Sequence, residues 1–264
     1  MAEPADPSLV ADLFGVAGKT VVVTGGTRGI GRMIAGGFVA GGATVIVSSR
    51  KADACAETAA ALSEHGSCTG IPADLSTEEG ARGLAEAVAA GHDHVDVLVN
   101  NAGATWGAPL AEHDHASWSR VLDLNVEGIF HTTKFFLPLL QAAGTADDPA
   151  RVINIGSIDG IHTPLLETYS YSASKAAVHQ LTRHLAKHLA PSITVNAVAP
   201  GPFESKMMAA TLAAAGDAIA RSAPLKRIGR PDDMAGVALF LASRAGSYLT
   251  GTVIPVDGGI ATTA

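Results

Sequence analysis

The chain has 264 residues, of which 47% are hydrophobic and 16% are charged, so it can bury the core of a single large domain. Its formal net charge of -7 at pH 7 and the lack of any lysine- or arginine-rich run argue against a nucleic-acid partner. The sequence has no secretion-signal pattern and no run of 18 uncharged apolar residues, which argues against a membrane protein. We therefore expect one cytoplasmic domain, 1–264, with a frayed N-terminal extension at 1–15.

The two cysteines, Cys55 and Cys68, form neither a paired framework nor a Cys-x-x-Cys unit. This sparse usage is typical of a reducing compartment. We interpret both side chains as packing residues.

Short β-branched runs alternate with alanine-rich stretches of helical spacing along the whole chain. Most of the runs are apolar on both faces, which is typical of strands in a parallel sheet covered by helices on both sides. The pattern predicts an α/β fold, a doubly wound Rossmann-type parallel sheet of about seven strands flanked by helices. The expected strands are 20–24, 43–47, 68–73, 95–100, 151–155, 193–199 and 252–256.

A glycine-rich segment, 24–31, joins the first expected strand to an apolar-periodic helix. Gly25 permits a tight turn, while Gly29 and Gly31 allow backbone to approach a pyrophosphate at the positive end of the helix. Thr27 and Ile30 belong to the same predicted cofactor-binding loop. The spacing differs from G-x-G-x-x-G, so an ordinary strand-to-helix turn is the alternative.

The end of the second strand selects between the two nicotinamide dinucleotides, since an acidic side chain there would hold a free ribose 2'-hydroxyl. Ser49 occupies that position, Arg50 follows it, and Arg28 lies in the glycine loop. Two guanidinium groups can clamp a 2'-phosphate, which predicts NADP(H). The alternative is that both arginines are solvated surface charges.

Tyr171 and Lys175 stand four residues apart near the start of an expected helix. One helical turn separates them, so both side chains project from the same face. A nearby ammonium favours a phenolate, which predicts a lowered pKa for Tyr171 and a role as acid and base. Neither Tyr169 nor Tyr248 has a lysine at this spacing, although an ordinary amphipathic helix pair is the alternative.

Ser157 follows the fifth expected strand. Doubly wound folds place their chemistry at the carboxyl ends of strands, so we expect Ser157 to hydrogen-bond a substrate oxygen. Taken alone, it could equally be a turn residue.

Together these motifs resemble the short-chain dehydrogenase/reductase family over nearly the whole chain. Within that family, segments 71–76, 150–157 and 250–259 resemble NADPH-dependent β-ketoacyl reductases. The residues that carry the family resemblance are Thr24 to Gly31, Asn100 to Gly103, Asn125, Ser157, Tyr171, Lys175, Pro200 and Gly201.

The resemblance implies a catalytic tetrad. In it, Tyr171 protonates the carbonyl oxygen, Ser157 orients that oxygen, Lys175 holds the nicotinamide ribose, and Asn125 anchors a water relay. Donors already aimed at the oxygen would stabilise its developing negative charge. The implied reaction is reduction of a β-ketoacyl thioester to the β-hydroxyacyl form.

The resemblance also implies further cofactor contacts. Asp74 and Leu75 would lie at the adenine, although Asp74 could instead cap a helix. Asn100, Asn101, Ala102 and Gly103 would lie beside the cofactor, with Pro200 and Gly201 beneath the nicotinamide.

After Gly201 the chain departs from the family pattern of a small β-branched residue and then threonine. It has Phe203, with Ser205 as the candidate substitute for that threonine, and segment 206–223 is the expected mobile cover.

Ten histidines raise the possibility of a metal site, but no group of them has a third ligand at structured spacing. We expect no metal. His162 and Trp106 lie near the expected substrate mouth, where each could line it or have no role.

Two alternatives stay open. One is a non-catalytic NADP(H)-sensing protein on the same fold, and the other is a dehydrogenase or reductase for a sugar, steroid or polyketide alcohol. The expected partners are a small carbonyl or acyl thioester substrate, with acyl carrier protein as one possible thioester carrier. The resemblance further implies a homotetramer.

Overall fold

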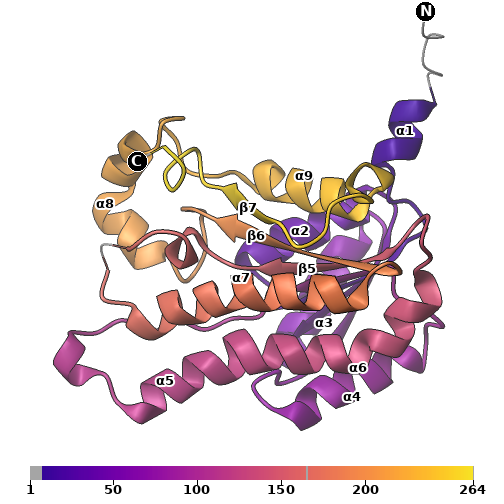
Figure 1. Ribbon diagram of the computed structural model, residues 1–264, viewed down its shortest axis with the longest axis horizontal. Helices are drawn as coiled ribbons and strands as arrows, with labels where there is room; N and C mark the ends of the chain where they lie inside the picture. Colours follow the sequence, from indigo (N-terminus) through magenta and orange to yellow (C-terminus); the bar gives the residue numbers. More distant parts are fainter. Residues whose placement is uncertain (1–7, 165, 264) are drawn as a thin grey trace, which may run out of the picture.

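A seven-stranded parallel sheet forms the centre of the protein (Figure 1). The structure is a computed structural model and describes residues 8–164 and 166–263. The strand order is β3-β2-β1-β4-β5-β6-β7, so consecutive strands lead away from β1 on both sides. This confirms the doubly wound Rossmann-type sheet predicted from the sequence, and it places the topological switch point between β1 and β4.

The described elements have the following bounds. The strands are β1 (Thr20–Thr24), β2 (Thr44–Ser49), β3 (Ser67–Pro72), β4 (Val97–Asn100), β5 (Ala150–Ile155), β6 (Ile193–Pro200) and β7 (Val253–Val256). The helices are α1 (Leu9–Phe14), α2 (Gly29–Ala40), α3 (Ala52–Ser63), α4 (Glu78–Ala89), α5 (His115–Leu122), α6 (Gly128–Ala143), α7 (Tyr169–Leu189), α8 (Ala209–Ser222) and α9 (Pro231–Ala242). Four short helical turns join them: η1 (Leu110–Glu112), η2 (Asp123–Glu127), η3 (Ile158–Gly160) and η4 (Arg244–Gly246).

Helices cover both faces of the sheet, as Figure 1 shows. Alternate residues of β1 point to opposite faces: Val21 and Val23 belong to one buried cluster and Val22 to the other. The first cluster contains side chains from α2, α3 and α9, and the second contains side chains from α4, α6 and α7. Because both faces are buried, the strands are apolar throughout, which is why the sequence pattern identified them.

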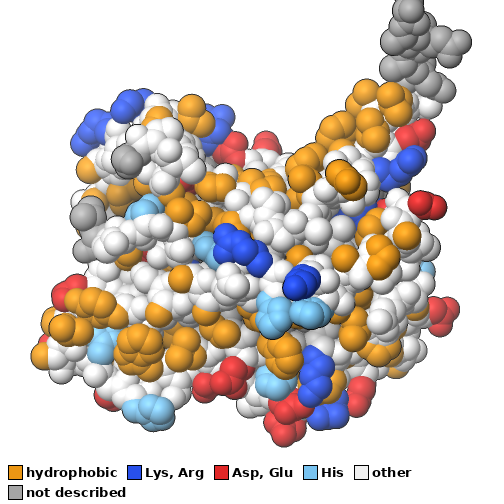
Figure 2. Space-filling view, in the orientation of Figure 1, with side chains coloured by type: hydrophobic (Ala, Val, Ile, Leu, Met, Phe, Trp, Pro, Cys, Tyr) orange, Lys and Arg blue, Asp and Glu red, His pale blue; other side chains and the backbone are white. Residues whose placement is uncertain are grey.

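The N-terminal extension differs from the prediction of a frayed segment at 1–15. Residues 9–14 form helix α1, and the Phe14 ring lies 6.5 Å from the ring of Phe240 on α9. None of the α1 residues is buried, and the helix projects from the body with apolar side chains on its surface (Figures 1 and 2). A contact with α9 thus orders this part, while the predicted fraying of residues 1–7 lies outside the described residues.

The two cysteines lie where the sequence interpretation expected them, in packed positions. Cys55 and Cys68 are buried and unpaired, which confirms their packing role, and burial raises the pKa of Cys68 to about 11. Within the described ranges, no helix is both long enough and apolar enough to cross a membrane.

Candidate active site

The glycine loop lies at the switch point of the sheet, between the end of β1 and the start of α2. Gly25 has a φ of 62° and Gly29 a φ of 51°, conformations that favour glycine. A Cβ at Gly31 would lie 2.4 Å from both Asn101 Nδ2 and Gly25 O, so a larger residue does not fit there. The glycines are therefore needed for local backbone geometry.

Asn101 ties this loop to the end of β4. Its Nδ2 donates to the carbonyls of Thr24 and Gly25 at 2.9 and 3.1 Å. The backbone N–H groups of Asn101 and Ala102 both donate to Thr24 Oγ1, at 2.9 and 3.0 Å. The two strand ends at the switch point are thus held together by hydrogen bonds within the protein.

The N-terminus of α2 has the properties of an anion site. No side chain caps it, and its first turn contains no acidic residue, so its free N–H groups and positive dipole end are available to a phosphate. Ile30 packs against the core, and the Thr27 carbonyl accepts a hydrogen bond from Thr58. These two contacts hold the glycine loop against the rest of the protein.

Arg28 and Arg50 are exposed at this end of the sheet. Among the described residues, neither guanidinium has a hydrogen-bond or ion-pair partner. Ser49 Oγ lies 3.3 Å from Cys55 Sγ, so an uncharged side chain stands where an acidic one would hold a ribose. The geometry fits a nucleotide with an additional phosphate.

Asp74 lies close to Arg50, at the end of β3. Its carboxylate accepts hydrogen bonds from the N–H and hydroxyl of Ser76 at 3.1 and 2.7 Å. Burial opposes ionisation of this carboxyl group, but Ser76 and then Arg50 lower its pKa. Thr77, not Asp74, caps α4, and Leu75 is buried in the core, so only its backbone can face a ligand.

Three of the predicted catalytic side chains converge where β5 ends and α7 begins. Ser157 and Lys175 are 7% and 5% exposed, and the Tyr171 hydroxyl is hydrogen-bonded to Ser157. The Lys175 Nζ lies 5.5 Å from the centre of the Tyr171 ring and donates to the Ile155 carbonyl at 2.7 Å. The structure therefore places a hydroxyl pair and an ammonium together, with Tyr171 and Lys175 near each other on α7 as their four-residue spacing predicted.

The prediction of a lowered pKa for Tyr171 is wrong in this structure. Burial raises the pKa of Tyr171 to about 12, the hydrogen bond with Ser157 opposes this, and the charge of Asp159 adds to it. Burial also lowers the pKa of Lys175 to about 8, against the attraction of Asp159. The sequence argument considered the helical spacing alone and could not include desolvation or a carboxylate from another element.

Asn125 lies in the π-helical turn η2 and is completely buried. Its Nδ2 donates to Ser174 Oγ and to the Ala104 carbonyl, both at 2.9 Å, and its Oδ1 accepts from Ala104 N at 2.8 Å. A Cβ at Gly103 would lie 3.3 Å from Asn125 Oδ1 and 3.8 Å from Lys175 Nζ. Asn125 therefore joins the segment after β4 to the helix of Tyr171 and Lys175.

Asn100 does not lie beside a cofactor site through its side chain, contrary to what the resemblance implied. It is 2% exposed, and its Nδ2 donates to Thr133 Oγ1 and Asn154 Oδ1 at 3.1 and 2.9 Å. The side chain points toward α6 and joins β4 to β5. Periodicity along one strand could not reveal this partner on a neighbouring strand.

Four residues at the end of β6 and just after it have different surroundings. Pro200 ends the strand, and a Cβ at Gly201 would meet Asp257 Cβ at 2.7 Å. Phe203 is 2% exposed and packs in the core, which excludes it from a surface facing the cofactor. Ser205 accepts from Met208 N at 3.2 Å, and its Cβ would lie 3.2 Å from a Cβ at Gly29, so Ser205 reaches the glycine loop.

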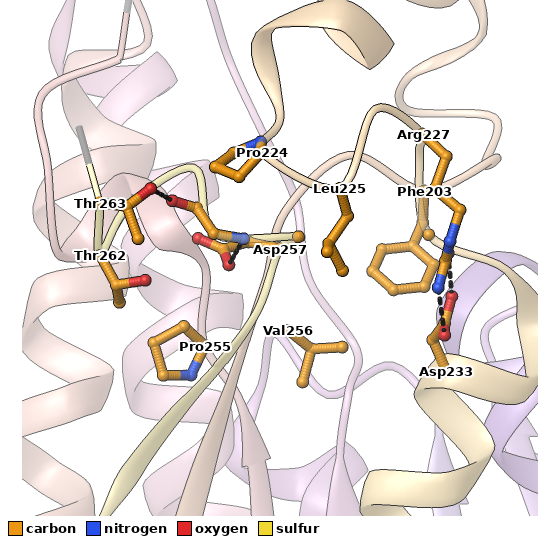
Figure 3. A pocket seen from close by; sticks show the side chains of 13 residues that line it. Phe203, Pro224, Leu225, Arg227, Asp233, Pro255, Val256, Asp257, Thr262 and Thr263 are labelled. Carbon is orange, nitrogen blue, oxygen red and sulfur yellow. Dashed lines mark hydrogen bonds and ion pairs between the residues drawn. The ribbon is translucent and has the colours of Figure 1, made fainter.

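A hollow of about 520 Å³ is lined in part by the Phe203 ring (Figure 3). The end of β7 and the loop after α8 line it, and the ion pair of Arg227 with Asp233 lies beside the Phe203 ring. A Cβ at Gly229 would meet that ring at 2.2 Å. None of the predicted catalytic side chains reaches this hollow, so it is separate from the site at β5 and α7.

The remaining candidates are polar and aromatic groups near the mouth. The His162 Nδ1 lies 3.0 Å from the Thr163 carbonyl, and its Nε2 is buried without a described partner. Trp106 is 37% exposed beneath the guanidinium of Arg120, which lies 5.8 Å from the ring centre. These contacts assign neither His162 nor Trp106 a role.

The histidine-rich segments form no cluster of three or more metal-binding side chains in the described part of the chain. His113 contacts two segments of the protein. Its Nε2 lies 2.9 Å from the Ala108 carbonyl, and its ring packs edge-on against Tyr169. It joins the loop after β4 to the segment that leads into α7.

Sequence reasoning missed Asp159. This carboxylate lies two residues after Ser157 and acts on both Tyr171 and Lys175. An acidic residue two positions after the candidate catalytic serine was a signal that could have been noticed.

The fold and the site together define a dinucleotide-dependent oxidoreductase, with a glycine loop at the switch point of the sheet and a Ser-Tyr-Lys group where β5 ends and α7 begins. A family model described as "Enoyl-(Acyl carrier protein) reductase" matches residues 25–261. The chain belongs to the short-chain dehydrogenase/reductase family.

Two relatives and one solved structure show the extent of the similarity. The chain is 49% identical over 249 residues to a rhamnolipids biosynthesis 3-oxoacyl-[acyl-carrier-protein] reductase of Pseudomonas aeruginosa, covering 93% of this chain and 97% of the relative. It is 38% identical over 250 residues to the 3-oxoacyl-[acyl-carrier-protein] reductase FabG of Aquifex aeolicus, covering 92% and 97%. The solved Pseudomonas aeruginosa RhlG/NADP active-site complex has a TM-score of 0.91 and 48% identity, covering 95% of this chain and 99% of that one.

Proposed function

We propose that the protein is an NADPH-dependent carbonyl reductase that converts β-ketoacyl thioesters to β-hydroxyacyl thioesters. The observation that carries the proposal is the convergence of Ser157, Tyr171 and Lys175 where β5 ends and α7 begins. The similarity to two 3-oxoacyl-[acyl-carrier-protein] reductases over more than nine-tenths of the chain supports the substrate class.

The residues at the switch point fit NADP(H). The uncapped N-terminus of α2 would bind the pyrophosphate, and Arg28 and Arg50 would bind the 2'-phosphate. Ser49, Asp74, the backbone at Leu75, and the segment from Asn101 to Gly103 would complete the nucleotide site. Pro200, Gly201 and Ser205 would lie at the nicotinamide end, and the bound cofactor supplies the hydride.

The reaction adds one hydride and one proton to a ketone, giving a secondary alcohol. Ser157 donates a hydrogen bond to the carbonyl oxygen, and Tyr171 transfers its hydroxyl proton to that oxygen as negative charge develops there. A pKa of about 12 keeps Tyr171 protonated at neutral pH, as an acid in the reductive direction requires. Lys175 holds positive charge beside the phenol and would contact the ribose of the bound cofactor.

Asn125 would help to hold Tyr171 and Lys175 in place. By bonding Ala104 and Ser174, it holds the segment after β4 against α7. A water relay to Tyr171 through Asn125, as the resemblance implies, belongs to the proposal.

Purified protein tests the function through the loss of NADPH absorbance with β-ketoacyl N-acetylcysteamine thioesters, compared with a panel of sugar, steroid and polyketide ketones. We expect turnover with the thioesters and at least tenfold lower kcat/KM with the other ketones. Preferential turnover of a ketone from the panel would reject the substrate class. Turnover of none would favour a non-catalytic NADP(H)-sensing protein.

The proposal also includes acyl carrier protein as the physiological thioester carrier, a homotetramer and a cytoplasmic location. Acyl carrier protein in place of the mimic tests the first, through a lower KM for the carrier-bound substrate. Light scattering tests the second, since a monomeric mass would contradict it.

A further inference from the structure

Two glycines delimit the turn that carries Ser157. Gly156 follows the end of β5 and Gly160 is the last residue of η3, so residues 156–160 form one unit, the serine turn. The Gly156 N–H donates to the Val198 carbonyl on β6 at 2.7 Å, which joins the start of the turn to the sheet. The N–H groups of Asp159 and Gly160 donate to the Oγ and the carbonyl of Ser157, both at 3.1 Å. These bonds fix the shape of the serine turn, but none of them joins it to α7.

The imidazole of His179 on α7 packs against both glycines. A Cβ at Gly156 would overlap His179 Nε2 and lie 2.8 Å from its Cδ2, and a Cβ at Gly160 would lie 2.8 Å from its Cε1. Neither glycine has a positive φ, so backbone conformation does not require glycine at either position. At Gly156 the two nearest atoms both belong to the ring, so packing against His179 excludes a larger residue there.

Burial of His179 has a cost that core packing alone does not explain. The side chain is 4% exposed, and Nε2 has no hydrogen-bond partner in the described part of the chain. A buried nitrogen without a partner lowers stability, so packing alone would favour a hydrocarbon side chain at this position. The ring is better explained as a spacer between the serine turn and α7.

The separation of the serine turn from α7 decides how Ser157 meets Tyr171. Tyr171 lies about two turns before His179 on the same helix, and its hydroxyl is hydrogen-bonded to Ser157. Because one hydroxyl belongs to the turn and the other to the helix, a change in their separation changes the distance between the two groups. The ring of His179 lies between the turn and the helix.

We propose that His179 is a positioning residue, whose imidazole holds the serine turn at a fixed separation from α7 so that Ser157 and Tyr171 meet in the geometry that carbonyl reduction needs. The proposal rests on the proposed roles of Ser157 and Tyr171, and the family resemblance did not supply His179.

Hydrogen exchange of the full-length protein, followed by mass spectrometry, tests the spacing without any substrate. Peptides covering residues 156–162 report opening of the serine turn, because its amides donate hydrogen bonds. We expect His179→Ala to speed their exchange by about tenfold or more, since a large-to-small change removes the support of the turn. His179→Gln, with a side chain of similar size, should retain nearly the original rate.

Val88→Ala is the matched control for the loss of a buried side chain. Val88 lies on α4 and is fully buried in a cluster that contains no residue of the serine turn. This variant should leave exchange of 156–162 unchanged. Equal acceleration in Val88→Ala, or unchanged exchange in His179→Ala, would overturn the proposal.

A double substitution tests whether the ring and the turn act on each other directly. Gly156→Ala places a methyl group against the His179 ring, so by itself it should also speed exchange. In Gly156→Ala/His179→Ala the methyl group has room, so the two effects should combine to less than their product. Independent effects would overturn the proposal. If circular dichroism shows that His179→Ala does not fold, His179→Val takes its place under the same criteria.

Kinetics test the consequence for catalysis if the proposed reductase activity is found. His179→Ala should lower kcat by about tenfold or more, because it displaces Ser157 from Tyr171, with unchanged NADPH affinity. Gly156→Ala/His179→Ala should recover part of kcat. An unchanged kcat in His179→Ala would overturn the positioning role. Since hydrogen exchange needs no substrate, failure to find a substrate would count against the proposed function alone and would leave the exchange test decisive.

Discussion

Asn125 and Ala104 hold each other through two hydrogen bonds. The Ala104 N–H donates to Asn125 Oδ1 at 2.8 Å, and Asn125 Nδ2 donates back to the Ala104 carbonyl at 2.9 Å. The side-chain amide thus pairs with the backbone of Ala104 as a neighbouring strand would, and it fixes the segment after β4.

Replacing Asn125 with alanine should destabilise the protein by about 2–4 kcal/mol, because the buried groups of Ala104 and Ser174 lose their partner. Urea unfolding followed by circular dichroism measures the change. The control is Gln141→Ala, an exposed amide on α6, which should stay within about 0.5 kcal/mol of wild type. Equal stability of the Asn125 variant and the control would contradict the reciprocal bonding.

The substitutions Gly31→Ala and Gly83→Ala should have opposite effects on protein stability. A Cβ at Gly31 would lie 2.4 Å from Asn101 Nδ2, whereas a Cβ at Gly83 on α4 would meet nothing within 4 Å. We expect Gly31→Ala to weaken NADPH binding and to lower the melting temperature. Gly83→Ala should raise stability by about 0.5–1 kcal/mol through helix propensity, with unchanged NADPH affinity. Fluorescence titration and thermal unfolding of both variants test the pair, and a tolerated Gly31→Ala would disprove the close packing.

Tyr171→Phe should lower kcat by a factor of about 10²–10⁴, since general acid catalysis commonly contributes this much. NADPH affinity should stay near that of wild type, because only the hydroxyl is removed. Tyr169→Phe is the matched control, as this phenol bonds to Glu167 at the surface, and its kcat should be unchanged. Activity retained by Tyr171→Phe would refute the assignment.

Arg50→Asp should lower kcat/KM with NADPH by about 10- to 100-fold, the value of a lost charge-assisted hydrogen bond. The ratio of kcat/KM with NADH to kcat/KM with NADPH should therefore rise. Arg244→Asp, an equal charge change at an exposed arginine on η4, should leave both values unchanged. An unaltered ratio of NADPH to NADH activity in Arg50→Asp would mean that the arginine is only a solvated charge.

His179 should make stability depend on pH. Burial lowers the pKa of His179 to about 4, against a hydrogen bond with the Gly160 backbone, whereas an unfolded histidine has a pKa near 6.5. As pH falls, the unfolded state therefore binds this proton before the folded state does. The free energy of unfolding decreases between about pH 6.5 and pH 4, by about 3 kcal/mol at most. Urea unfolding between these values should show a steeper loss for wild type than for His179→Gln. Parallel curves would contradict a buried neutral imidazole.

Local patterns were sufficient for the architecture and for several site residues. The strand around Val22 is apolar on both faces because both are buried, and the glycine loop follows it directly in the chain. The four-residue spacing of Tyr171 and Lys175 is a property of the helix itself. Such features depend on neighbours in sequence, so the sequence predicted them.

Other features depend on groups that are distant in the chain. Asn100 looked like a cofactor contact, but its partner, Asn154, lies on the adjacent strand. Phe203 packs against the position of Gly229, which no periodicity in either segment indicates. The pairing of strands and loops decided the roles of these two side chains.

The sequence by itself determined the parallel sheet, the glycine loop and the presence of Tyr171 and Lys175 on one helix face, because each arises from backbone geometry over a few residues. Only the tertiary structure decided the electrostatics of that pair. Burial of the phenol and the approach of Asp159 on a separate turn raise the pKa of Tyr171, where spacing alone predicted a decrease. Desolvation and charge act through space, and their balance exists only after the chain has folded.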